Sequence, residues 1–245
     1  DERMAVQART FTRWINLVLQ RSDPPAAVHD LFKDIQDGRI LMALLEQLSG
    51  SKLLYRFRSP PQRIFRLKNI SEVLTFLADK QVQLPHMHAS AVVDGDPSVV
   101  LRLVWSVILH FQAGLSGRSA SARLRPGLSA PVKQVVGGLP GHDGGTVRAL
   151  LQRVQRCTSR FGVEVHDFGR SWRSGLAFLA LVKSVNPALV DLSASWSREP
   201  GENLQQAFAI ARSSLDVAPL LEPDDLLGRV TDEPSIITYV SMFFQ

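Results

Sequence analysis

The 245-residue sequence contains only one cysteine, Cys157, and no long uninterrupted apolar segment. A single thiol cannot form an intrachain disulfide or a cysteine-rich metal cluster, which fits folding in a reducing compartment. The longest apolar run, Val99 to Phe111, is 13 residues long and is interrupted by polar residues at Arg102, Ser106 and His110. It is too short and too polar to cross a bilayer, and no signal peptide opens the chain. We therefore expect a cytoplasmic protein with no transmembrane segment in this sequence.

Groups of residues that could support catalysis or hold a metal ion are also scarce. His86 and His88 flank Met87, but no acidic residue or cysteine completes a site at the spacing that metal ligands need. Asp94-Gly95-Asp96 lacks the glutamate of a calcium loop, and the proline that follows predicts a turn and a helix cap. The paired glycines at 137–138 and 144–145 lack the Gly-Lys-Ser/Thr ending of a phosphate loop. We expect no enzymatic activity, no metal and no cofactor.

The net charge of +5 is spread unevenly along the chain. Residues 1–112 carry 14 Lys and Arg against 11 Asp and Glu, residues 113–143 carry 4 against 1, and residues 144–245 carry 10 against 11. A basic first half favours an acidic partner, which could be nucleic acid, anionic lipid or an acidic protein filament. The basic residues do not cluster with aromatic residues that could stack on bases, so we do not expect nucleic-acid binding.

The chain carries nearly the same pattern twice. Residues 32–50 read FKDIQDGRILMALLEQLSG and residues 168–187 read FGRSWRSGLAFLALVKSVNP, with glycine pivots at Gly38 and Gly175. Asn69 is repeated by Asn203, and the Asp-Pro-Ser at 96–98 by the Glu-Pro-Ser at 233–235, at offsets of 137, 134 and 137 residues. Three ordered matches at one large offset indicate a duplicated domain of about 100 to 110 residues rather than an array of short repeats.

Helical periodicity dominates both copies, and convincing strand alternation is missing. An apolar stripe opens the chain at Phe11, Trp14 and Ile15, and denser apolar runs follow at 40–48, 69–77 and 99–111. The second copy has its runs at 147–154, 176–185, 204–210 and from 234 onward. Residues 113–143 are rich in Gly, Pro and Ser, a composition typical of a flexible linker. We therefore predict an all-α protein of two domains, 1–112 and 144–245, each with four main helices plus short ones. The last helix reads as truncated, which suggests an excerpt from a longer protein.

These motifs resemble a tandem calponin-homology actin-binding domain of the spectrin superfamily. The resemblance covers the whole chain except the linker, and residues 63–67 together with the long linker are most similar to the calmin and nesprin branch. Two positions depart from the family pattern: Arg153 replaces a tryptophan that is common there, and Ser174-Gly175 replaces the usual Asp-Gly. The matching segments are residues 9–16, 30–32, 37–38 and 97–101 of the first domain, and 171–178, 203–208, 220–225 and 233–240 of the second.

Two helices of the first domain are candidate contacts for filamentous actin. On the opening helix, Thr10, Arg13 and Leu17 project away from the apolar stripe, and on the last helix a narrow polar strip is bordered by apolar residues. The pattern alone favours ordinary solvated surfaces, but the resemblance implies actin-contacting roles, with Phe11 and Trp14 as core residues that position them. The predicted contacts are Gln7, Thr10, Arg13 and Leu17 on the first helix and Val99, Arg102, Leu103 and Ser106 on the last. Arg148 and Gln152 of the second domain are predicted as weaker contacts.

A basic cluster around Pro60-Pro61 suggests a second kind of partner. It is either a patch for anionic lipid, including phosphoinositides, or a solvated loop and helix start. Its candidate lipid-binding residues are Arg56, Arg58, Arg63 and Arg66. The resemblance implies a non-catalytic module that tethers a larger cytoskeletal or membrane-linked protein to actin, with the first domain as the main contact and the second modulating it. Anionic-lipid binding is the alternative, and whether the two domains pack closed or stay open is not decided by the sequence.

Overall fold

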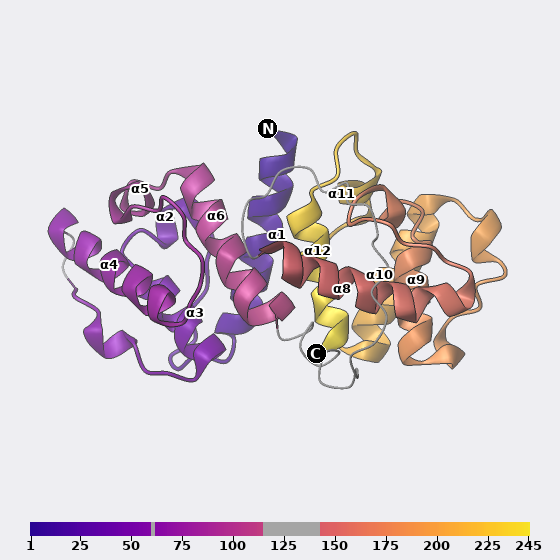
Figure 1. The fold of residues 1–245 in the computed structure, drawn as a ribbon, viewed down its shortest axis with the longest axis horizontal. Coiled ribbons are helices and arrows are strands. Elements are labelled where there is room, and N and C mark those ends of the chain that lie inside the picture. The colour runs from indigo at the N-terminus through magenta and orange to yellow at the C-terminus, as the bar shows by residue number, and fades with distance from the viewer. Residues whose placement is uncertain (60–61, 115–142) are drawn as a thin grey trace. The chain divides into compact units, whose positions relative to one another are not determined.

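In the computed structural model, residues 1–59, 62–114 and 143–245 are described, and every regular element in these ranges is helical (Figure 1). The chain divides into two compact units, residues 1–111 and 112–245. The predicted all-α class is therefore confirmed for the part of the chain that is described. Residues 115–142, most of the predicted linker, lie outside it, as do Pro60 and Pro61.

The first unit contains four longer helices with short elements between them. The longer helices are α1 (Glu2–Leu19), α3 (Arg39–Ser49), α4 (Arg63–Asp79) and α6 (Pro97–Val107). The short elements are α2 (Leu31–Asp34), the 3-10 turn η1 (Leu54–Arg56) and α5 (Ala89–Val93). Helix α6 continues into a π-helical segment, η2 (Ile108–Ala113), which the apolar pattern did not predict.

The second unit repeats this plan, which confirms the expected four main helices plus short ones. Its longer helices are α8 (Asp143–Thr158), α9 (Leu176–Val185), α10 (Pro200–Leu215) and α12 (Glu233–Ser241). Among residues 143–245, the short elements are α11 (Pro223–Leu227) and five 3-10 turns: η3 (Ser159–Phe161), η4 (Arg170–Trp172), η5 (Pro187–Leu189), η6 (Ser195–Ser197) and η7 (Met242–Phe244).

Two helices extend beyond the ranges that the apolar pattern predicted. Helix α4 begins at Arg63, before the predicted start at Asn69, and α10 begins at Pro200, before the predicted start at Leu204. The first turn of α10 is Pro-Gly-Glu, which continues no apolar pattern, whereas the first turn of α4 includes Ile64 and Phe65, which are exposed and half-buried and so lie outside the buried stripe. Proline fits the first turn of α10 because a residue there needs no intrahelical hydrogen bond from its nitrogen.

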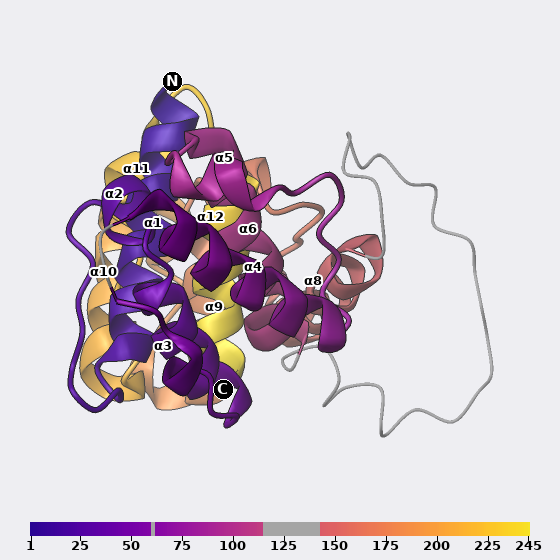
Figure 2. The same cartoon turned by 90° about the vertical axis from the view of Figure 1, so that its left-hand side faces the viewer.

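The core of the first unit lies where α1 packs against α3 and α6 (Figure 2). The rings of Phe11 on α1 and Trp105 on α6 stack with centroids 6.3 Å apart and planes 3° from parallel. Phe11 and Trp14 are both completely buried, as their predicted role in the core requires. Burial of such large side chains contributes about 1.5 to 3 kcal/mol each to folding.

A glycine and an asparagine meet in the same way in each unit. Gly38 has φ +87°, and a Cβ built on it would lie 2.8 Å from the Cβ of Asn69. Gly175 has φ +78°, and its Cβ would lie 2.6 Å from that of Asn203. Only glycine meets both requirements, a left-handed backbone and a close approach to α4 or α10. The repeated glycine and asparagine motifs of the sequence are therefore one contact, made twice.

The buried asparagine then joins three segments of its unit. Asn69 Nδ2 donates to the carbonyl of Asp37 at 2.8 Å and to that of Arg58 at 2.9 Å, and Oδ1 accepts from the amide of Arg58 at 2.8 Å. Asn203 Nδ2 donates to the carbonyls of Ser174 at 3.1 Å and Ser195 at 2.9 Å. The Asn69 side chain thus fixes the backbone that follows η1 against α4.

Candidate binding surfaces

The predicted contact residues of α1 do not form a single exposed strip. Gln7, Arg13 and Leu17 are half-buried, but Thr10 is completely buried, so its predicted place on the outer face is wrong. The residues one turn before and after it, Val6 and Trp14, are both buried, and Thr10 lies between them on the inner side of the helix. The sequence prediction took Phe11 and Ile15 as the centre of the buried face, and it did not extend that face to the side of the helix that carries Val6, Thr10 and Trp14.

The predicted strip on α6 is mostly accessible. Arg102 is exposed, and Val99 and Ser106 are half-buried. Leu103 is completely buried, so its predicted place at an exposed margin is also wrong. Val100 and Val107, three residues before and four after it, are buried on the same side of the helix, and the buried arc therefore includes Leu103.

The stack of Phe11 on Trp105 makes α1 and α6 neighbours and decides which candidates lie near each other. At 100° per residue, Gln7 projects about 40° from Phe11 around α1, whereas Arg13 projects about 160° from it. Gln7 is thus on the flank of α1 nearest to α6. Leu17 and Arg13 project about 120° and 160° from Phe11, on the same side as Gln7 but farther round α1 from α6.

In the second unit, Arg148 and Gln152 are exposed one turn apart on α8, as the solvent-face reading of that helix predicts. The same helix carries Arg153, whose guanidinium lies 4.3 Å from the centroid of the Phe244 ring. Arg153, where the resemblance implies a tryptophan, is therefore packed on an aromatic ring of its own unit.

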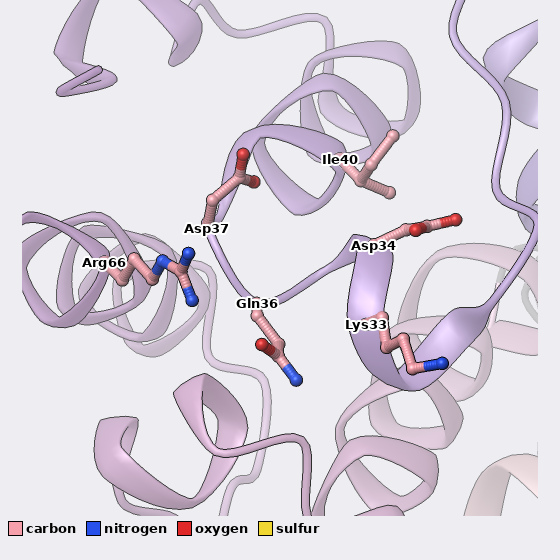
Figure 3. Close-up of a pocket in the computed structure, with 6 residues that line it drawn as sticks. All are labelled: Lys33, Asp34, Gln36, Asp37, Ile40 and Arg66. Carbon is pink, nitrogen blue, oxygen red and sulfur yellow. The ribbon is translucent and has the colours of Figure 1, made fainter. Parts of the chain in front are cut away.

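The four arginines of the predicted lipid cluster are divided among three places. Arg63 is paired with Asp94, with Nη2 3.2 Å from Oδ2. Arg66 points toward Gln36 and Asp37 and lines a pocket of about 360 Å³ (Figure 3). Arg56 and Arg58 line a different and larger groove of about 630 Å³. The basic run in the sequence is therefore not one continuous patch.

The smaller pocket has mixed charge. Its other lining residues are Lys33, Asp34, Gln36, Asp37 and Ile40. Lys33 Nζ lies 3.0 Å from the carboxylate of Asp30, which hydrogen bonding and charge attraction by Lys33 hold at a lowered pKa. With two carboxylates and two cations around it, this pocket has no preference for an anion.

The larger groove lies between one face of α4 and the segment that includes η1. It is lined by Arg56, Arg58, Ile64, Leu67, Lys68, Asn69, Ser71 and Glu72. Arg56 Nη1 donates to Glu72 at 2.8 Å, and Arg56 Nε donates to the Tyr55 hydroxyl at 2.9 Å. The hydrogen bond to Tyr55, and next that to Glu72, raises the pKa of Arg56, which stays protonated.

Two residues at this groove were missed by the sequence analysis. Tyr55 is 70% exposed and Ile64 is 57% exposed, the highest fractions among the large apolar side chains of the described residues. Neither gives a signal in the sequence, because exposure of an apolar residue depends on what the fold leaves uncovered.

The described residues hold no group of three or more His, Cys, Asp or Glu side chains arranged for a metal ion. Within the same ranges, none of the helices combines the length and apolar character needed to span a bilayer.

Comparison with known families identifies the fold. The family model described as the calponin homology (CH) domain matches residues 5–113 and again residues 146–245. The chain belongs to the calponin homology domain family. It carries two copies of the domain in tandem, as the duplicated motifs predicted.

Known relatives place the chain within this family. It is 46% identical over 260 residues to mouse calmin, 36% identical over 261 residues to mouse nesprin-2, and 37% identical over 249 residues to the mouse erythrocytic spectrin beta chain. Each match includes 100% of this chain but only 25%, 4% and 11% of the respective relative. The predicted resemblance to calmin and nesprin is confirmed, and the chain spans about a quarter or less of these proteins.

A solved structure has the same fold. The actin-crosslinking core of Schizosaccharomyces pombe fimbrin aligns with a TM-score of 0.73 over 99% of this chain and 48% of that one. The two are 17% identical, so this likeness concerns the fold.

Proposed function

We propose that this tandem calponin-homology module attaches a larger protein to actin filaments without catalysing a reaction. The observation that carries the proposal is the double family match, which includes nearly all of the chain outside residues 114–145. The fimbrin fragment with the same fold is described as an actin-crosslinking core, which supports filamentous actin as the partner.

The first unit provides the main contact in this proposal. Its candidate surface now consists of Gln7, Arg13 and Leu17 on α1 and of Val99, Arg102 and Ser106 on α6. Arg102 is an exposed cation that can steer the encounter with an acidic filament, whereas half-buried Leu17 and Val99 can bury apolar area in the complex. Thr10 and Leu103 are no longer part of the surface.

Cosedimentation with filamentous actin tests the proposal directly. We expect the folded module to pellet with a Kd of about 1 μM, which corresponds to about −8 kcal/mol. Leu17→Glu and Arg102→Glu should each reduce pelleting, while Arg212→Glu, a charge reversal at an exposed position of α10, should not. A folded module that does not pellet at concentrations well above this Kd would refute actin attachment.

The second unit has a modulating role in the proposal. Arg148 and Gln152 present an exposed polar face on α8 that can add a weaker filament contact. We expect Arg148→Glu to weaken pelleting less than Arg102→Glu does. Equal losses would mean that both units contribute alike. The proposed location is the cytoplasm, at the actin cytoskeleton, with any membrane anchor outside this sequence.

Binding to anionic lipid is the second candidate function, and the groove between η1 and α4 favours it. Arg56 and Arg58 line this groove, whereas Arg63 and Arg66, the other two predicted lipid-binding residues, lie elsewhere.

A further inference from the structure

We propose that Ser59 is a phosphorylation site and that its phosphate is held by Arg58 and Lys68, two cations of the larger groove. A protein kinase transfers the γ-phosphoryl group of ATP to the Ser59 hydroxyl. The Oγ–P bond forms, the bond from the γ-phosphorus to the bridging oxygen breaks, and ADP and the hydroxyl proton leave. This site does not depend on actin attachment, and only its effect on filament binding rests on the proposed function.

The residues around Ser59 form a pattern that a kinase can recognise. Ser59 is the only serine or threonine of the 245 residues that is followed by proline, Pro60. Arg56 stands three residues before it and Arg58 one residue before it. Charge patterns around the acceptor contribute to kinase specificity, and arginine pairs strongly with carboxylates. A proline-directed kinase with acidic groups in its cleft therefore fits both features.

The fold presents this segment to solvent in an extended form. Residues 57–59 follow η1 outside any helix, and Ser59 is exposed. Phe57 has φ −61° and ψ 129°, which is extended backbone, and the proline after Ser59 biases the serine toward the same region. Protein kinases bind their substrates as extended chains, so the acceptor hydroxyl is accessible in the conformation that a kinase needs.

Two contacts with α4 hold this segment in place. The amide and the carbonyl of Arg58 are bonded to the buried side chain of Asn69, so the backbone keeps its conformation before a kinase arrives. Arg56 donates to Glu72, and a kinase must break this pair in order to bind the arginine. Both side chains of the pair are about half exposed, so the pair is weak and opens easily.

Cations that can hold the phosphate lie beside Ser59. Arg58 is the preceding residue, and it lines the groove together with Lys68. Glu72 is the carboxylate among the described residues that line the groove, and it pairs with Arg56. A phosphoserine carries a charge of about −2 at pH 7 and three acceptor oxygens, so it can form charge-assisted hydrogen bonds with an arginine and a lysine. One phosphate would thus cancel the basic character of the groove.

The second unit provides an internal comparison. In each unit the repeated asparagine donates to a backbone carbonyl, that of Arg58 in the first unit and that of Ser195 in the second. The next residue is Ser59 in the first unit but Trp196 in the second. Tryptophan has no hydroxyl to accept a phosphoryl group, and the three residues before it, Ser-Ala-Ser, include no cation. The duplicated fold therefore repeats the contact, whereas the acceptor and its cations belong to the first unit at this position.

Phosphorylation would also change the charge of the first domain. Residues 1–112 carry three more Lys and Arg than Asp and Glu, and one phosphoserine cancels most of this excess. A basic surface attracts an acidic filament, so the phosphorylated module should associate more slowly. We expect pelleting with actin to be about three-fold weaker at low salt, and the difference should disappear at high salt because the charges are screened.

Phosphorylation of the folded module tests the site. The module is incubated with ATP and a proline-directed kinase that prefers arginine three residues before its serine, and mass spectrometry locates the phosphate. We expect incorporation at Ser59, and none in Ser59→Ala. Arg56→Gln should slow the reaction about ten-fold, since one charged hydrogen bond to the kinase is lost. Arg63→Gln removes an exposed arginine four residues after the serine and should not slow it.

The phosphorus-31 resonance of the modified module, followed against pH, tests whether the groove cations hold the phosphate. Nearby cations favour the dianion, so they should lower the second pKa of the phosphoserine by about one unit from its usual value of about 6. Arg58→Gln and Lys68→Gln should each return this pKa toward 6. Lys80→Gln is the matched control and should leave it unchanged, because Lys80, like Lys68, is exposed and lies over a phenylalanine ring, but it does not line the groove.

Each contrary outcome has its own meaning. If a synthetic peptide of residues 54–65 is phosphorylated but the folded module is not, or if the phosphate is found on other serines, the site is overturned. If neither glutamine variant in the groove changes the phosphate pKa, the pairing with Arg58 and Lys68 is overturned. If the phosphorylated and unmodified modules pellet equally at low salt, the effect on the filament is wrong and the site stands. If neither form pellets, the proposed actin attachment fails, and the phosphate at Ser59 still decides the site.

Discussion

The guanidinium of Arg153 lies over the ring of Phe244, 4.3 Å from its centroid, and joins α8 to the 3-10 turn η7 in the second unit. The family resemblance of the sequence implies a tryptophan at the position of Arg153. Here a flat cation covers the ring instead, so a substitution that looks disruptive in sequence keeps a planar contact in the structure.

Replacement of Arg153 by alanine should destabilise the second unit by about 0.5 to 1 kcal/mol, the usual value of a partly exposed cation–π contact. Arg153→Trp should retain most of this stability because an indole can also stack on Phe244. Arg156→Ala, an exposed arginine of the same helix, is the matched control and should have little effect. Denaturant unfolding followed by circular dichroism measures all three, and equal losses for Arg153→Ala and Arg156→Ala would contradict the packing role.

Gly38→Ala should cost about 3 kcal/mol of unfolding free energy. A left-handed backbone penalises any Cβ by about 1 to 2 kcal/mol, and overpacking against Asn69 adds about 1 to 3 kcal/mol. Gly50 also has a positive φ, +72°, but an added Cβ there would meet nothing within 4 Å. Gly50→Ala therefore isolates the backbone cost, and Gly38→Ala should be clearly worse. If the two variants melt alike, the close approach of Asn69 is energetically unimportant.

Thr10→Val should stabilise the first unit by about 1 kcal/mol. The Thr10 hydroxyl is buried, and its Oγ1 has no hydrogen-bond partner among the described residues. Replacing it by a methyl group removes the cost of an unsatisfied polar atom. Thr12 is two residues away on α1, and its Oγ1 donates to the carbonyl of Ala8 at 2.7 Å. Thr12→Val should therefore not share the gain, and thermal melting of the two variants distinguishes them.

The interaction of Asp30 with Lys33 should make the start of α2 sensitive to acid. Asp30 accepts from the amide of Phe32 at 3.1 Å, and its pKa is lowered first of all by the hydrogen bond to Lys33. A carboxyl whose pKa is lower in the folded state stabilises the fold above its unfolded pKa of about 4, and that stabilisation is lost as the pH falls through the folded value. Asp30→Asn should thus be less stable than the unmodified chain at pH 7, and the difference should vanish at lower pH. A pH-independent difference would exclude a contribution from the charge.

Elements bounded by strong local signals could be predicted from the sequence. Helix α9 occupies the predicted range Leu176–Val185 because Gly175 and Asn186 mark its two ends. Helix α4 was predicted to begin at Asn69, later than it does, because Ile64 and Phe65 of its first turn lie outside the stripe that the fold buries. Thr10 and Leu103 were misplaced because a single-helix projection does not show how far the neighbouring elements cover its flanks.

The groove could not have been predicted, because its walls are brought together by tertiary contacts. The sequence showed Gly38 and Asn69 as repeated motifs, but not that they touch or that Asn69 reaches back eleven residues to Arg58. The run of basic residues was visible, yet the pairing of Arg63 with Asp94 depends on the packing of α5, which Asp94 follows, against α4. The sequence shows that this segment is basic, but only the fold shows which of its cations are paired and which line the groove.

Asn69 also determines how the segment that follows η1 can open. Its side chain holds the amide proton of Arg58, a residue whose own side chain is exposed. That proton can exchange with solvent only when its hydrogen bond to the buried Asn69 side chain breaks. Movement of Asn69 also breaks its hydrogen bond to the Asp37 carbonyl, next to Gly38. The segment around Arg58 therefore does not open like an ordinary surface loop. We expect the Arg58 amide to take up deuterium slowly, at the rate set by cooperative unfolding of the whole first domain.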